Sequence, residues 1–151
     1  MAEQYYGLPL KFSDVFKKKE LIRVDDVKQS IGFNVRLILR SHFGENRFDY
    51  SYGCSVWDRD FEVIDSHSAW SEELSQSIRD TLVMHEKRMQ NIKVDTKISE
   101  QEFTSGTGNN IIHRVKRKIT VIISFNYYLT NEAWTLTEVL YISPLSIEES
   151  Q

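Results

Sequence analysis

The chain has 151 residues, of which 40% are hydrophobic and 27% charged, and its formal net charge is −3 at pH 7. This composition is typical of a globular protein and excludes an intrinsically disordered chain. The small negative charge provides no overall field that would attract nucleic acid or an anionic membrane. Cys54 is the only cysteine, so no disulfide can form within the chain, and a reducing compartment such as the cytoplasm is expected.

The N-terminal segment lacks the basic and apolar regions of a secretory signal, and no apolar run approaches the ~20 residues that cross a bilayer. We therefore expect no membrane insertion. Residues 1–24 are predicted to form an extended arm. Pro9 disfavours a helix at Leu8 and limits any strand there to a sheet edge. The charged residues 17–20 are expected to lie in a solvated loop.

The first long helix is predicted over residues 26–41, with Asp25 or Asp26 as its N-cap. Apolar residues recur there at helical spacing. They are Val27, Ile31, Val35 and Ile38, with Leu39 on the flank.

A second helix is predicted over residues 71–89. Its apolar stripe comprises Leu74, Ile78, Leu82, His85 and Met89. In this interpretation Glu72 and Glu73 occupy the first turn and Lys87 and Arg88 the last, as the helix dipole favours. His85 is expected to be a core residue with its hydrogen bonds satisfied.

After Asn91 the hydrophobic period becomes two, which predicts strands. The first covers residues 92–98, a turn-rich loop follows at 105–110, and a long strand runs over 115–127. Asn131 and Glu132 indicate a turn before a third strand at 134–142, which Pro144 ends. The whole chain, residues 1–151, is thus predicted to be one α+β domain. Its two main helices cover a three- to four-stranded, mainly antiparallel sheet, and residues 145–151 form a tail.

Signals for metal or cofactor chemistry are weak. The four histidines are scattered without ligand spacing, so no metal site is expected. No cofactor and no small-molecule substrate are predicted either. Arg114, Lys116 and Lys118 alternate along the long strand, where they could meet RNA, but protection of an exposed strand edge is the favoured interpretation.

Glycoside hydrolysis is the one enzymatic reaction that the sequence suggests, because it uses a pair of carboxylic acids. The candidates are Glu45, Asp49, Glu62 and Glu86. Lys87 and Arg88 adjoin Glu86 and would lower its pKa, which is the wrong direction for a general acid. We therefore expect no catalytic residue, and a lysozyme-like peptidoglycan hydrolase remains the alternative.

Several features occur in a fixed order along the chain. The first predicted helix is followed by Gly44 and Glu45, then by Tyr52 and Gly53, and then by Trp57, which opens an aromatic and acidic run. Gly44 is expected to end the helix, because a glycine after a helical pattern usually adopts the left-handed conformation that stops it. Gly53 indicates a turn or a close backbone approach that a side chain would block. The second helix ends in Glu86, Lys87 and Arg88. In this order and spacing the chain resembles the GPW-type baseplate wedge family, which includes the sheath initiator of contractile phage tails and TssE of type VI secretion baseplates. Residues 5–10 and 47–49 look most like Bacteroidetes type VI members. Lys87 stands where the family has proline.

The resemblance implies a structural, non-enzymatic subunit that links the baseplate wedge to the first sheath ring and templates sheath polymerisation. Its fold would be similar to the sheath subunit's own domain. Implied partners are wedge subunits similar to TssF, TssG and TssK, and sheath subunits similar to TssB and TssC. No nucleic acid is expected among them.

The resemblance makes Gly44, Glu45, Tyr52, Gly53 and Trp57 the family-defining structural positions. It also favours a partner-binding role for Glu86, Lys87 and Arg88. From spacing alone, Glu86 and Arg88 could equally brace the fold internally. The sequence leaves open whether the chain serves a phage tail or a secretion system.

Overall fold

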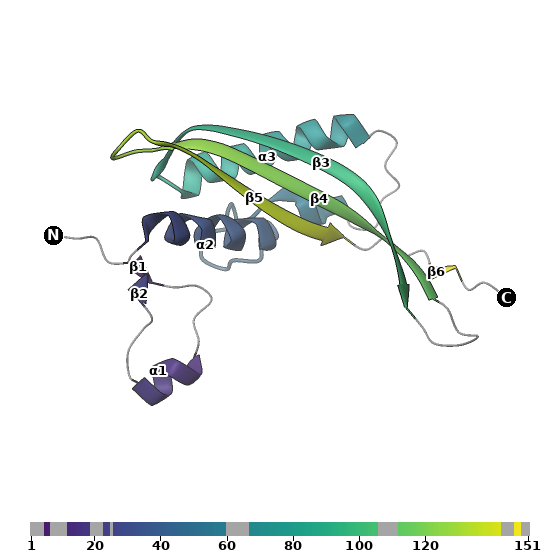
Figure 1. Cartoon of the computed structure of the whole chain (residues 1–151), viewed down its shortest axis with the longest axis horizontal. Helices are drawn as coiled ribbons and strands as arrows, with labels where there is room; N and C mark the ends of the chain where they lie inside the picture. Colours follow the sequence, from purple (N-terminus) through teal and green to yellow (C-terminus); the bar gives the residue numbers. More distant parts are fainter. Residues whose placement is uncertain are drawn as a thin grey trace.

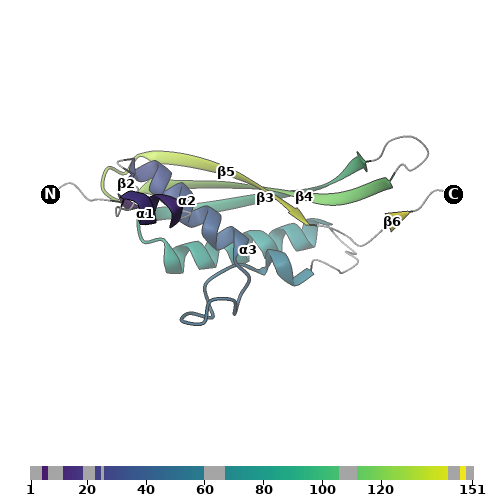
Figure 2. The same cartoon turned by 90° about the horizontal axis from the view of Figure 1, so that it is seen from below.

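The computed structural model describes residues 5–6, 12–18, 23–24, 26–59, 67–105, 112–142 and 147–148. Two long helices, α2 and α3, cover one face of an antiparallel sheet, and the other face carries no helix in the described part of the chain (Figures 1 and 2). The predicted α+β fold class is confirmed. None of the described helices is long and apolar enough to cross a membrane.

Helix α2 spans Val27–Arg40, close to the predicted residues 26–41. Its N-cap is Asp26, whose carboxylate accepts a hydrogen bond from the backbone N–H of Lys28 at 2.9 Å. This bond satisfies one of the amides that a helix start leaves unpaired. The predicted apolar stripe is buried against the sheet, with Ile31, Val35, Ile38 and Leu39 inaccessible to solvent.

Helix α3 spans His67–His85, so the predicted range 71–89 was shifted toward the C-terminus at both ends. Trp70, Leu74, Ile78 and Leu82 form its buried stripe. Glu72 and Glu73 therefore lie beyond the first turn, and Lys87 and Arg88 form a turn after the helix. The helix stops early because Met89 is buried as the first residue of the next strand. Between the helices, Ser55–Arg59 forms a short 3₁₀ helix, η1.

The sheet has the order β3-β4-β5, with strands Met89–Ser105, Ile112–Tyr127 and Ala133–Ile142. A tight turn joins β4 to β5, with Asn131 at a φ of 56° and a backbone hydrogen bond of 2.9 Å from Tyr127 N to Glu132 O. Within the predicted tail 145–151, Ile147–Glu148 form β6, which pairs with the start of β4. Pro144 and the loop residues 106–110 lie outside the described residues.

The inner face of β4 forms the centre of the core. Ile119, Val121, Ile123 and Phe125 are buried beneath the helices. The indole of Trp134 on β5 stacks on the ring of Tyr127, with centroids 4.8 Å apart. Farther along, β3 and β4 run on beyond α3 (Figure 2), and β3 residues 99–104 are exposed.

The prediction that Arg114, Lys116 and Lys118 protect a sheet edge was wrong. Strand β4 is the central strand, with β3 on one side and β5 and β6 on the other. Lys118 pairs with Ser99 on β3 and with Tyr141 on β5. Lys116 and Lys118 are partly exposed and alternate with Arg117 and Ile119, which are buried on the other face of the strand.

Residues 1–24 were predicted to form an extended arm, but the described part of this segment is not extended throughout. Phe12–Lys18 form a helix, α1, which includes Lys17 and Lys18 of the expected loop. Strands Tyr5–Tyr6 (β1) and Arg23–Val24 (β2) pair antiparallel with each other. Leu8, Pro9, Lys19 and Glu20 lie outside the described residues.

Candidate functional site

The turn after α3 holds the charged pair that the sequence singled out. The guanidinium of Arg88 donates from Nε to Glu86 Oε1 at 2.7 Å and from Nη2 to Oε2 at 2.6 Å. The amide of Asn34 on α2 donates to Oε2 at 2.9 Å. Glu86 is only 3% exposed, so its carboxylate is bonded from two sides within the chain.

The electrostatics of this pair favour the ionised carboxylate. Burial raises the pKa of Glu86, but hydrogen bonds from Arg88 and Asn34, together with the positive charge of Arg88, outweigh burial and hold that pKa below its usual value. A general acid needs a raised pKa, so this carboxyl group is not suited to glycosidic protonation. Burial and the Glu86 charge raise the pKa of neighbouring Tyr52, whose hydroxyl donates to Asn34 Oδ1 at 3.3 Å.

The same turn connects four elements. Arg88 Nη1 donates to Ser30 Oγ on α2 at 3.0 Å, and the backbone carbonyl of Arg88 accepts from Tyr128 N beyond β4 at 3.1 Å. Residues 86–88 therefore join α2, α3, β3 and the β4–β5 turn. Of the two roles left open for Glu86 and Arg88, the structure displays the internal contact. Binding of a partner by this pair stays a prediction, and Arg88, with its side chain 20% exposed, is the member that a partner could reach.

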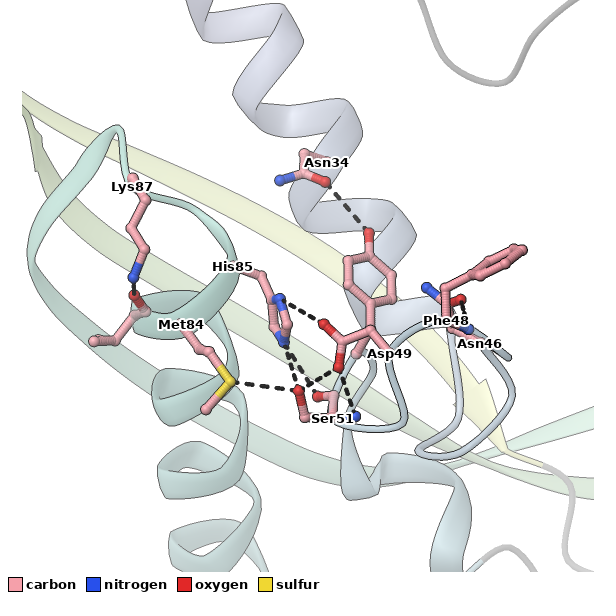
Figure 3. Close-up of polar contacts among 10 residues, drawn as sticks. Asn34, Asn46, Phe48, Asp49, Ser51, Met84, His85 and Lys87 are labelled. Atoms are coloured by element: carbon pink, nitrogen blue, oxygen red, sulfur yellow. Dashed lines mark hydrogen bonds and ion pairs between the residues drawn. The ribbon is translucent and has the colours of Figure 1, made fainter.

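Lys87, at the family's proline position, contacts the end of α3 (Figure 3). Its ammonium group donates to the carbonyl oxygen of Val83 at 3.1 Å, in the last turn of α3. A lysine there satisfies a carbonyl that the helix end leaves unpaired and complements the negative end of the helix dipole.

The two singled-out glycines have different tasks. Gly44 has a φ of +80° and its N–H donates to Tyr50 O at 3.0 Å, which closes the loop after α2. It does not end α2, as the sequence suggested, because the helix stops at Arg40. Gly53 has a φ of +131°, and a Cβ there would lie 2.7 Å from Ser41 O. The predicted close backbone approach at Gly53 is confirmed.

The remaining family-defining residues support this loop and the core. Glu45 Oε2 accepts from His42 N at 3.0 Å. Trp57 on η1 is partly buried, and its indole Nε1–H donates to Leu39 O at 3.1 Å, near the end of α2. Phe61 and Glu62 lie outside the described residues.

A polar network between α3 and the loop was not anticipated from the sequence (Figure 3). His85 Nδ1 lies 3.7 Å from Asp49 Oδ2, and Nε2 lies 3.3 Å from Ser51 O. The Ser51 side chain and backbone N–H donate to Asp49, and these bonds hold the pKa of Asp49 below its usual value. The hydrogen bonds of His85 are satisfied, as predicted, by a loop more than thirty residues away in sequence, but the residue is only partly buried and lies outside the core.

Ser51, His85 and Asp49 do not form a nucleophile–base–acid relay. The Ser51 hydroxyl donates to Asp49 Oδ1 at 2.6 Å and lies 3.4 Å from His85 Nε2, so its hydrogen points to the carboxylate and not to the imidazole that would have to remove it. In the described part of the chain, no three His, Cys, Asp or Glu side chains are grouped so as to hold a metal ion. The arrangement is suited to fixing the shape of a surface.

The chain is similar to known proteins in sequence and in fold. The sequence profile of the family described as "Baseplate wedge protein gp25" matches residues 25–131. A crystal structure from Geobacter sulfurreducens, named a "putative tail lysozyme", is similar with a TM-score of 0.54 and 15% identity, over 82% of this chain and 97% of that one. A chain of "the baseplate complex from the type VI secretion system" has a TM-score of 0.48 and 15% identity, over 73% of this chain and 88% of that one. No curated protein matches.

At 15% identity the similarity to the Geobacter structure shows a shared fold, and it does not assign an activity to this chain. The profile match is of a different kind, because it covers most of the chain, including α2, α3, the Glu86–Arg88 turn, β3 and β4. The chain belongs to the family of baseplate wedge protein gp25.

Proposed function

We propose that this protein is a cytoplasmic, non-enzymatic baseplate subunit of a contractile injection machine of the type VI secretion kind. In this role it links the wedge to the first sheath ring and provides the template on which the sheath polymerises. Its partners are wedge subunits similar to TssF, TssG and TssK and sheath subunits similar to TssB and TssC. Family membership supports the baseplate role, and the resemblance of residues 5–10 and 47–49 to Bacteroidetes members supports the secretion system.

The observation that carries the templating role is the length and exposure of β3. This strand has 17 residues and lies at an edge of the sheet. An exposed edge is a site at which a strand of another protein can add through backbone hydrogen bonds, each contributing about 0.5–1.5 kcal/mol net.

Helix α3 restricts where such a strand can add. The hydroxyl of Ser71 donates to the backbone carbonyl of Thr96 at 2.7 Å, so this part of the β3 edge is already bonded to the helix. The N–H and C=O of a strand residue point to the same side and alternate along the strand. Thr96, Ile98, Glu100 and Glu102 therefore turn their backbone groups outward, and the two glutamates lie in the exposed stretch of β3, residues 99–104.

The test is recovery of partners by tagged full-length protein from its own cells. Wild type is expected to recover wedge and sheath proteins. Glu100→Pro removes an outward N–H and should lose the sheath proteins while keeping the wedge proteins. Glu100→Ala is the matched control, because it removes the same side chain and keeps the N–H. Failure of the wild type to recover any baseplate or sheath protein would refute the proposed function.

A further inference from the structure

A groove of about 570 Å³ lies between the outer face of α3 and the loop that follows α2. Phe43 and Ser51 line it from the loop, and Glu73, Asp80 and Met84 line it from the helix. None of these residues takes part in the Glu86–Arg88 pair or in the β3 edge. The groove is therefore a second surface, separate from the one on which strand addition is proposed.

Hydrogen bonds hold the two walls of the groove in place (Figure 3). Ser51 contacts the helix at Met84 Sδ, 3.4 Å from its hydroxyl, and at His85, which bonds its carbonyl oxygen. The loop is closed internally by the bond from Gly44 N to Tyr50 O. Because both walls are already ordered, a ligand would bind here without the entropic cost of arranging the site.

The chemistry of the groove selects one kind of ligand. Met84 is 54% exposed, a large apolar side chain left partly in water. Glu73 and Asp80 add two exposed carboxylates. Asp80 accepts a hydrogen bond of 2.7 Å from the amide of Gln76, which is neutral and leaves the negative charge of Asp80 in place. No lysine or arginine is among the described residues that line the groove. The exposed Met84, together with the acidic rim formed by Glu73 and Asp80, complements an apolar side chain that has a cation beside it.

From this complementarity we infer that the groove binds a segment of another protein in which an apolar side chain is followed within one helical turn by lysine or arginine. The inference rests on the proposed function, since a baseplate subunit is surrounded by other proteins. An acidic segment would be repelled by the rim. A wholly polar segment would leave the exposed methionine in water.

Site-specific photo-crosslinking tests this inference in cells that assemble the machine. Benzoylphenylalanine replaces Met84 in the full-length protein, and a second version carries it at Thr137, on the opposite face of the sheet. Met84 is expected to crosslink to a different protein, at an apolar residue within four positions of lysine or arginine. Thr137 should not give this product.

Charge variants show whether the rim selects the ligand. Asp80→Lys should lower the yield of the Met84 crosslink by about fivefold or more. Glu132→Lys changes the net charge by the same amount, at an exposed position in the β4–β5 turn that does not line the groove. It should leave the crosslink yield unchanged. The inference is overturned by crosslinks to an acidic or wholly polar segment, to a second copy of this chain, or by no crosslink at all. It is equally overturned if the yield of the Met84 crosslink is the same with and without Asp80→Lys.

The outcomes separate the two proposals. If tagged protein recovers baseplate proteins while Met84 gives no crosslink, the groove inference fails alone and the proposed function stands. If no baseplate protein is recovered but Met84 crosslinks to a basic and apolar segment with the expected dependence on Asp80, the proposed function fails and the groove inference stands.

Discussion

Arg88 binds the carboxylate of Glu86 with two guanidinium nitrogens, at 2.7 and 2.6 Å, although the two residues are separated by only one position in the chain. Glu86 is buried and Arg88 largely so. A bidentate pair in this setting is a strong charge-assisted contact, but each charge depends on the other to offset its removal from water. The pair therefore stabilises the turn after α3 and also holds together the elements that meet there.

Removal of one partner should be costly. Glu86→Gln removes the charge that Arg88 binds through two nitrogens, and we expect a loss of about 3 kcal/mol in the free energy of unfolding, as for other broken buried pairs. Urea unfolding followed by circular dichroism measures this change. Lys87→Ala, at an exposed neighbouring position, should change stability by less than about 0.5 kcal/mol. Equal effects of the two substitutions would refute the bracing role.

The same pair predicts a pH dependence of stability. The folded-state pKa of Glu86 lies below its ordinary value of 4.5, so the ionised carboxylate stabilises the fold above that pH. This contribution is lost as the pH falls from 4.5 through the lowered folded-state pKa. Wild type should therefore lose more stability than Glu86→Gln between about pH 5.5 and about pH 3.5, which lie one unit on either side of the ordinary value. Parallel losses in the two proteins would contradict this prediction.

Gly53 and Gly32 form a matched pair for substitution by alanine. At Gly53 a Cβ would meet backbone atoms of Ser41 and His42 at 2.7–2.9 Å, with φ at +131°, so the loop must shift. We expect Gly53→Ala to destabilise the protein by about 2 kcal/mol or more. At Gly32, inside α2, a Cβ would have no atom within 4 Å, and alanine should stabilise the helix by about 0.5–1 kcal/mol. Thermal unfolding should show a lower melting temperature for Gly53→Ala and a higher one for Gly32→Ala. A Gly53→Ala protein as stable as wild type would show that the close approach is not required.

Cys54 should be unreactive in the folded protein. Burial raises the pKa of its thiol to about 11, and the side chain is inaccessible to solvent. Only the thiolate attacks disulfide reagents. Labelling with dithionitrobenzoate at pH 8 should therefore be slow in buffer and fast in denaturing urea, with the native rate rising only as the protein unfolds. Rapid labelling under native conditions would mean that the loop opens readily around Cys54.

The part of the candidate site that the sequence predicted is the part encoded over short distances. The sequence indicated a turn or a close approach at Gly53 and a charged pair at Glu86 and Arg88, because a glycine and two opposite charges two positions apart are local signals. Asn34 and Ser30, which complete the pair from α2, carry no such signal, since each is a common polar residue on a helix flank. Their role depends on how α2 crosses the end of α3.

By itself the sequence determined the fold class, the helix from Asp26 onward and the presence of the three long strands, because hydrophobic period, capping and turn chemistry are properties of neighbouring residues. Only the tertiary structure decided where α3 ends, since burial of Met89 in the sheet overrides a helical pattern that continues past His85. It also decided that β4 is central, so that its basic residues lie on a face and not at an edge. Strand order and buried ion pairs arise from contacts between distant segments, which local periodicity does not encode.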